Sequence, residues 1–260
     1  MSSDCLRSIA AYAGVVDLAA VKAASRDEIA RCAAGAAGNA KDLLEDAEVL
    51  SAAGRHARSY ALAALAVEEA GKAASLFCLA VMPPKVRARV PLGRMLEWHQ
   101  LKLVGGMLIA AVPGRKDRTV AAQLTEMPES QVERILENAR ALAQDQDRLK
   151  QLGLYADIDS AGRVRLPSEV TADDVLAQLD RARHAVSSAS VMLDPGMLAF
   201  AADPPSEAVE FNRAIATAFG EAGNRRTPDA AAAVLLSAIS KLRAEAATAG
   251  AGAIPQRLDE

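Results

Sequence analysis

The sequence predicts an all-α fold: an antiparallel helical bundle with a small β-hairpin insertion and extra C-terminal helices. Of its 260 residues, 51% are hydrophobic but only 3% are aromatic, and much of the apolar content is alanine. Alanine favours helix and lets helices approach one another closely. Apolar residues recur at helical spacing in the longest segments, whereas alternation with a period of two is rare. These features indicate helices packed on helices rather than a sheet core.

The first long helix has a recognisable start and end. Ser25 and Glu28 form the pattern of a capping box, and Gly54 ends the helix because glycine readily adopts a positive φ. Apolar positions between them are three and four residues apart, which predicts a buried stripe. The stripe consists of Ile29, Ala33, Ala36, Ala40, Leu43, Ala47 and Leu50. A short amphipathic helix over residues 5–24 is expected to precede it.

The second helix is expected at about 55–82, where two prolines stop it. Because the connection at Gly54 is so short, the first two long helices must be antiparallel and form an αα-hairpin. A third helix is expected at about 92–112, followed by a polar, slightly basic loop over 113–128.

The fourth helix is expected at about 129–152, with Gly153 closing it. Charged residues are frequent along this segment, which predicts a solvated face. That face includes Glu133, Arg134, Glu137, Arg140, Asp145, Asp147, Arg148 and Lys150.

A β-hairpin is predicted from segments 154–158 and 162–166, which flank a short turn. An isolated hairpin is marginal in water, so we expect it to lie on the helices. A fifth helix at about 169–193 has Thr171 or Ser168 as its cap.

Two further helices fit residues 206–221 and 228–248. The chain is therefore expected to comprise an N-terminal helix (1–24), a helical bundle (25–195), a C-terminal helical extension (196–248) and a disordered tail (249–260).

Charge and cysteine content narrow the class of protein. The net charge is −3, so no overall basic field attracts nucleic acid, and any RNA contact requires a local patch. Cys5, Cys32 and Cys78 form neither a disulfide framework nor a metal motif. We expect them to be buried thiols in a reducing cytoplasm. The longest uncharged run, 103–113, is too short to span a bilayer, so no membrane partner is expected.

The segment 68–72 (EEAGK) is the first candidate for chemistry. Lys72 follows Glu68 by four residues and Glu69 by three, so this lysine can reach either acid along a helix. Gly71 weakens the helix interior by about 1 kcal/mol relative to alanine, which suggests the close approach of a backbone or a ligand. The alternative is an exposed ion-pair face of small stabilising value.

Arg94, His99 and Lys102 form the second candidate, in the third predicted helix. Residues three apart lie roughly 60° apart around a helix, so His99 and Lys102 share a face. Histidine suits proton transfer near neutral pH, and a nearby cation can stabilise a phosphate or an oxyanion. This combination suits metal-independent RNA cleavage. A lone helical histidine is, however, more often structural.

His56 lies beside Arg55 and Arg58 at a helix start, where a solvated side chain is the simplest interpretation. A di-iron bundle would require Glu-x-x-His pairs, and no histidine here is preceded by glutamate at that spacing. Phosphate-binding glycine loops and zinc-type Cys/His spacings are also missing. We therefore expect neither a metal nor a cofactor.

Several motifs occur in an order that resembles the AbiV family of bacterial abortive-infection proteins, over roughly residues 28–195. They are 39–50 (NAKDLLEDAEVL), Gly54-Arg55, 60–63 (YALA), 68–72 (EEAGK), 99–102 (HQLK), 154–157 (LYAD) and Pro167. Ala156 replaces the usual valine of the hairpin motif. Residues 1–24 and 200–260 lie outside the resemblance.

The resemblance implies an HEPN-like helical fold and a growth-arresting role during phage infection, exerted through RNA or the translation machinery and triggered by a phage component. Many HEPN-like proteins are metal-independent ribonucleases that act as homodimers, with an Arg-x(4–6)-His motif that Arg94 and His99 match. His99 would be the base or acid, and Arg94 and Lys102 would stabilise phosphate.

The resemblance also implies that Glu68, Glu69 and Lys72 lie beside His99 and Lys102 and orient them. The resulting cluster would be either catalytic or a structural network that fixes helix register.

Met95 differs from the polar residue that usually follows the motif arginine in ribonuclease members. This difference favours the alternative function, a non-catalytic helical protein that docks on the translation machinery or on a phage protein. A helical scaffold or antitoxin-like partner is the third interpretation.

Overall fold

The computed structural model describes residues 21, 23–82, 84–87, 102, 126–159, 161–193, 209, 213, 233, 236, 237, 239–241 and 244. In this part the chain is helical apart from one small two-stranded sheet, which confirms the all-α fold with a hairpin. No helix among the described residues is long and apolar enough to cross a bilayer.

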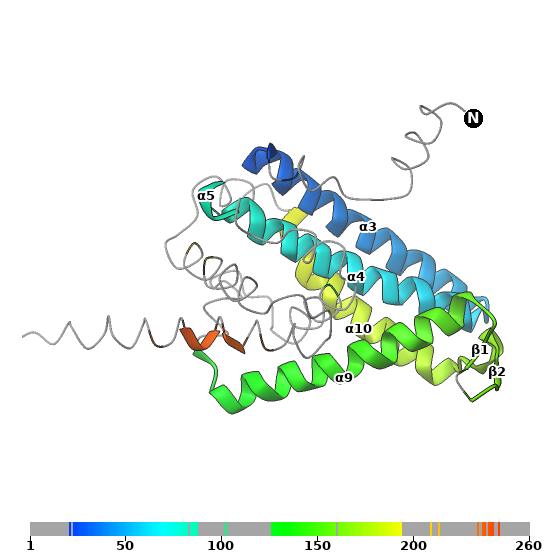
Figure 1. Cartoon of the computed structure of the whole chain (residues 1–260). Coiled ribbons are helices and arrows are strands. Elements are labelled where there is room, and N and C mark those ends of the chain that lie inside the picture. The colour runs from blue at the N-terminus through cyan, green and yellow to red at the C-terminus, as the bar shows by residue number, and fades with distance from the viewer. Residues whose placement is uncertain are drawn as a thin grey trace, which may run out of the picture.

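The first two long helices are α3 (Arg26–Ala52) and α4 (His56–Val81). They lie side by side and antiparallel, as predicted (Figure 1). Gly54 joins them with a φ of +70°. The capping box at the start of α3 is also confirmed, because the Ser25 side chain accepts from the Glu28 amide and the Glu28 carboxylate accepts from the Ser25 amide. After α4 comes a single turn, α5 (Pro84–Arg87).

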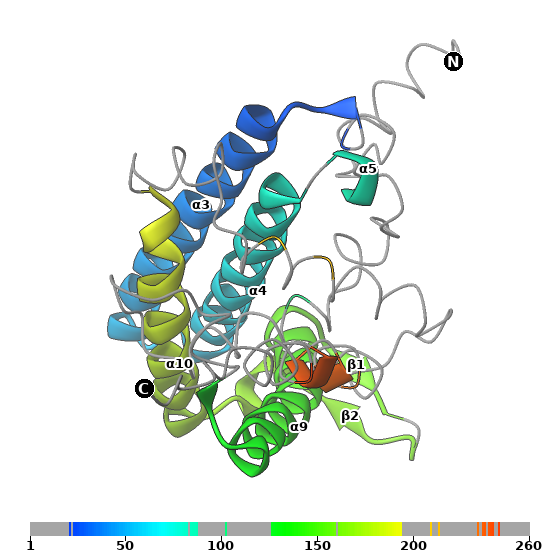
Figure 2. The ribbon, with the colours of Figure 1, turned by 90° about the vertical axis from the view of Figure 1, so that its left-hand side faces the viewer.

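The remaining elements complete the bundle around α4. They are α9 (Glu129–Leu154), β1 (Asp157–Ile158), β2 (Val164–Arg165), the 3-10 turn η1 (Pro167–Glu169), α10 (Ala172–Ser190) and the 3-10 turn η2 (Val191–Leu193). Helix α10 packs on both α3 and α4, and α9 packs on α4 (Figures 1 and 2). Thr171, rather than Ser168, caps α10, together with Asp174.

Alanine side chains line the contacts between these helices. Most of the stripe predicted for α3 is buried, and the alanines of α4 are buried on several sides. Small side chains allow the helix axes to approach closely, so α4 becomes the central helix of the bundle. The hydroxyl of Ser59 adds a buried bond across the α3–α4 contact, donating to the Ala47 carbonyl at 2.7 Å.

The prediction that Gly153 closes its helix is wrong, because α9 continues to Leu154. The glycine is needed for close packing instead. A Cβ atom added at Gly153 would lie 2.5 Å from the carbonyl oxygen of Ala57 in the first turn of α4. The end of α9 therefore contacts the start of α4 at a distance that only glycine permits.

The β-hairpin forms, but its strands do not lie on the helices as expected. The pairs are Asp157 with Arg165 and Ile158 with Val164, and the two apolar members are 65% and 62% exposed. The turn is held by Asp159, whose carboxylate accepts hydrogen bonds from the backbone amides of Ala161 and Arg163. Local polar contacts thus support a hairpin that buries little surface.

Two predictions about individual side chains are wrong. Lys150, assigned to the solvated face of α9, is only 4% exposed, because it lies on the face that packs on α4. Cys32 is exposed rather than buried, because it lies outside the α3 stripe. Cys78 is partly buried, and burial raises the pKa of its thiol to about 11. Cys5 lies outside the described residues.

Other predictions fall mainly outside the described residues. Of the helix expected at 5–24, Val21 and Ala23 are described and helical, and of that at 92–112, Lys102 is described and helical. The described positions within 206–221 and 228–248 are helical too. The tail 249–260 lies outside, and the division of the chain into four parts stays a prediction.

Candidate functional site

The site begins with two consecutive acids on α4. Glu68 and Glu69 point apart, because successive helix residues are about 100° apart around the axis. Glu68 is 2% exposed. Glu69 lies at the edge, where the Lys72 ammonium is 3.2 Å from its Oε2 and 3.3 Å from its Oε1. Of the two acids that Lys72 could reach in sequence, the structure thus pairs it with Glu69.

Glu68 is paired with Lys150 of α9, 82 residues away along the chain. Both side chains are almost fully buried. The Lys150 ammonium also lies 3.2 Å from Oδ1 of Asp147, one turn earlier on α9. Burial alone lowers the pKa of Lys150, but the charges and hydrogen bonds of Glu68 and Asp147 outweigh it and raise that pKa above its ordinary value. The lysine is therefore protonated and joins α9 to α4.

Lys102 joins the same group and is 8% exposed. Burial is the main cause of its lowered pKa. The carboxylates of Glu68 and Glu69 oppose this shift and favour the charged form of Lys102. The ammonium groups of Lys72 and Lys150 act in the other direction. Lys102 thus releases its proton more readily than an exposed lysine.

We call these six residues the polar cluster: Glu68, Glu69, Lys72, Lys102, Asp147 and Lys150. It contains three acids and three lysines, so the opposite charges balance when all are ionised. Such a group can position a substrate phosphate, move a proton, or hold helices in register. Beside it, Gln146 is fully buried and donates from Nε2 to the Ala64 carbonyl.

The structure brings together four of the six residues singled out in the sequence, namely Glu68, Glu69, Lys72 and Lys102. Arg94 and His99 lie outside the described residues. Gly71, within the same motif, is buried in α4. The solvated interpretation of His56 is wrong in part, because its ring is half-buried and its Nδ1 has no partner among the described residues.

Lys150 and Asp147 are the residues that sequence reasoning missed. A signal for Lys150 was present: the buried positions of α9 follow a spacing of four and three, and Lys150 continues it. These positions are Val132, Leu136, Ala139, Ala143, Gln146 and Lys150. A charged residue in phase with a buried stripe indicates a buried ion pair.

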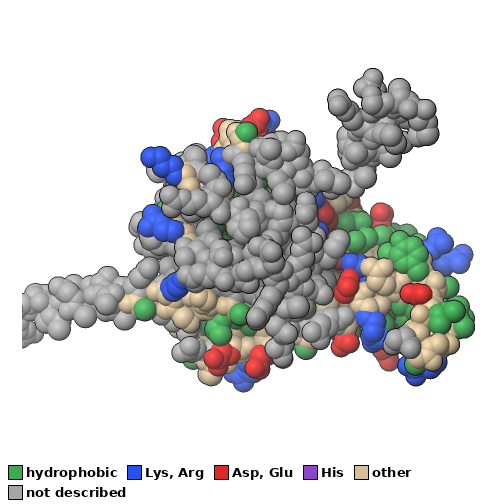
Figure 3. Space-filling model, in the orientation of Figure 1, with side chains coloured by type: hydrophobic (Ala, Val, Ile, Leu, Met, Phe, Trp, Pro, Cys, Tyr) green, Lys and Arg blue, Asp and Glu red, His purple; other side chains and the backbone are tan. Residues whose placement is uncertain are grey.

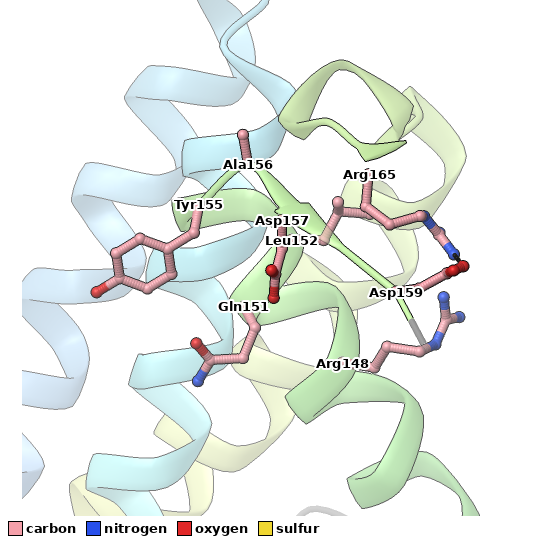
Figure 4. A pocket seen from close by; sticks show the side chains of 8 residues that line it. All are labelled: Arg148, Gln151, Leu152, Tyr155, Ala156, Asp157, Asp159 and Arg165. Carbon is pink, nitrogen blue, oxygen red and sulfur yellow. Dashed lines mark ion pairs between the residues drawn. The ribbon is translucent and has the colours of Figure 1, made fainter. Parts of the chain in front are cut away.

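A separate hollow of about 540 Å³ lies between the end of α9 and the hairpin (Figure 4). It contains no member of the polar cluster. Its lining residues are Arg148, Gln151, Leu152, Tyr155, Ala156, Asp157, Asp159 and Arg165. Arg165 points at Asp159, with Nη1 3.8 Å from Oδ2 (Figure 4). Within the described part of the chain, no group of three or more His, Cys, Asp or Glu side chains could hold a metal ion.

The HEPN_AbiV family model, described as AbiV, matches residues 28–187, more than half of the chain. The chain belongs to the AbiV family. No curated protein and no solved structure matches it. The matched range of this AbiV family member contains the whole polar cluster, as well as the hairpin and nearly all of α10.

Proposed function

We propose that this AbiV family member is an abortive-infection effector, which arrests growth or translation in an infected bacterial cell. It acts in the cytoplasm as a homodimer, on RNA or the translation machinery, after a phage component triggers it. Family membership supports the biological role. The observation that supports the proposed site is the polar cluster. Its six charged side chains lie together, whereas alanine lines the other contacts between the helices.

The proposed chemistry is metal-independent RNA cleavage. A base removes the proton of a ribose 2′-hydroxyl, and the oxygen attacks the adjacent phosphorus; His99 serves as this base or as the acid of the next step. The bond to the 5′-oxygen of the next nucleotide breaks, and that oxygen takes a proton from an acid. Arg94 and Lys102 stabilise the negative charge on the phosphate.

Glu68, Glu69 and Lys72 serve as positioning residues in this reaction. The carboxylates of Glu68 and Glu69 favour the charged form of Lys102, because they oppose the lowering of its pKa by burial. A charged Lys102 is the form that can stabilise phosphate.

A non-catalytic effector, which docks on the translation machinery or a phage protein, is the second candidate. The observation that favours it is the buried pairing of Glu68 with Lys150, since a mutually neutralised pair suits a structural role. The net charge of −3 and Met95 favour it as well.

The experiment compares wild type, His99→Ala and Glu69→Ala in cells challenged with phage, while total RNA is followed through the infection. Glu45→Ala is the matched control, because it removes an exposed acid paired with Lys41 on α3. The ribonuclease proposal expects RNA cleavage and protection to vanish in the first two variants and to persist in the control. Protection without RNA cleavage would support the docking protein instead, and growth of phage unaffected by wild type would refute both.

A further inference from the structure

The junction between α3 and α5 contains two arginines that the proposed function does not use. Arg26 is the first residue of α3, and Arg87 is the last residue of α5. Arg87 is only 4% exposed. Its Nη2 donates to the carbonyl oxygen of Ala24 at 2.7 Å, which directs the guanidinium towards the start of α3.

The rest of the Arg87 guanidinium has no acceptor in the described part of the chain. Its Nε and Nη1 are buried, and neither has a hydrogen-bond partner among the described residues. An arginine side chain stays charged in proteins, and a buried charge without a counter-charge is costly. Burial, followed by the neighbouring charge of Arg26, lowers the pKa of Arg87. Arg87 therefore places a desolvated positive charge at the junction.

The surroundings add further attraction for an anion. The amides in the first turn of a helix have no partners within it, and the helix dipole is positive at that end. The acids of this turn are Asp27, which is exposed, and Glu28, whose carboxylate accepts from Ser25 in the capping box. Lys85 is exposed on the same turn as Arg87, and Lys and Arg side chains gather at this edge of the molecule, at the upper left in Figure 3.

We propose that this junction is a binding site for a phosphate group, with Arg87 as its buried anchor and Arg26 and Lys85 beside it. A guanidinium presents parallel N–H donors that match two oxygens of a phosphate. Both parallel pairs of a guanidinium include Nη2, so the phosphate uses the N–H of Nη2 that Ala24 leaves open, together with an N–H of Nε or of Nη1. The depth of Arg87 favours a compact anion, either inorganic phosphate or the phosphate of a free nucleotide.

Thermal unfolding of the full chain tests the site, with inorganic phosphate titrated at constant ionic strength against chloride. We expect the midpoint of wild type to rise and saturate, and Arg87→Met to lose the response or to need about tenfold more phosphate. Arg134→Met, which removes an exposed arginine of α9, is the control and should respond like wild type.

Two additional variants keep the test decisive if Arg87→Met does not fold. Arg87→Lys retains the charge but loses the two-pronged contact, and Lys85→Gln removes the exposed cation; both should bind phosphate more weakly than wild type. A parallel titration with a nucleoside triphosphate distinguishes the two ligands. If the triphosphate saturates the response at a lower concentration than inorganic phosphate does, the ligand is a nucleotide. If both saturate it at the same concentration, the ligand is inorganic phosphate. Equal responses of wild type and the Arg87 variants, or an equal effect of chloride, would overturn the proposal.

Discussion

Replacing Lys150 with methionine tests the ion pair that joins α9 to α4. The substitution keeps an unbranched side chain of similar length but removes the ammonium group. Glu68 then loses its buried cation while its own side chain stays about 3% exposed. Breaking one side of a buried pair costs about 3–5 kcal/mol, and the Lys102 ammonium, which also interacts with Glu68, sets the expected loss towards the lower end of that range.

The contribution of Asp147 to this loss is small, because its side chain is 37% exposed. A pair with one exposed partner contributes at most about 1 kcal/mol. For a protein of this size, a loss of about 3–5 kcal/mol lowers the melting temperature by roughly 6–20 °C.

A double-mutant cycle separates the pair from its surroundings. The double variant Glu68→Met with Lys150→Met removes both charges, so its stability should be near that of wild type or above it. Lys41→Met is the control: it breaks the exposed pair with Glu45, and should change the free energy of unfolding by no more than about 0.5 kcal/mol.

The measurement is urea unfolding of wild type, Lys150→Met, Glu68→Met, the double variant and Lys41→Met, with stability taken at a common slope. If Lys150→Met costs no more than Lys41→Met, the reasoning about the buried pair is refuted. The double variant also informs function. A stable double variant that fails to protect cells from phage would assign the pair a role beyond holding the bundle together.

Three further predictions concern single residues. Gly153→Ala should destabilise the protein by up to about 2 kcal/mol in urea unfolding, because overpacking costs about 1–3 kcal/mol and the better helix propensity of alanine returns about 1 kcal/mol. Gly35 has open space around it, so Gly35→Ala should stabilise the protein. Equal effects of the two substitutions would contradict the close packing at Gly153. Lys102 has a lowered pKa when folded, so the unfolded chain holds its proton more tightly and wild-type stability should rise as the pH approaches about 10.4. Lys102→Met should flatten that rise in unfolding curves recorded against pH, and an unchanged rise would show that other groups cause it. Cys78, whose pKa is about 11, should react with a disulfide reagent at about pH 8 far more slowly than the exposed Cys32. Mass spectrometry measures the two reaction rates, and similar rates would contradict the burial of Cys78.

Helix boundaries were predictable where the signal is local. The Ser25–Glu28 capping box and the positive φ of Gly54 depend on residues within one turn, so the sequence contains all the interactions involved. The buried stripe of α3 follows from spacing alone. The same reasoning failed at Gly153, because a glycine at the end of a helix suggests termination locally, while its real neighbour is Ala57.

The site was predictable in part. Glu68, Glu69, Lys72 and Lys102 were chosen from motifs, and the structure brings them together. Lys150 was missed, because a charged residue is exposed in most helices and its partner lies 82 residues away. Long-range pairing of this kind depends on how helices pack, and composition and periodicity do not specify it.

The alanine lining of α4 also limits how this protein can evolve. Ala63, Ala64, Ala66, Ala70 and Ala73 have no exposed surface, so any larger side chain would force neighbouring helices apart, at about 1–3 kcal/mol for each change. Glycine would weaken the helix by about 1 kcal/mol. Substitutions are therefore tolerated better on the outer face of α9 than at these positions in the centre of the bundle.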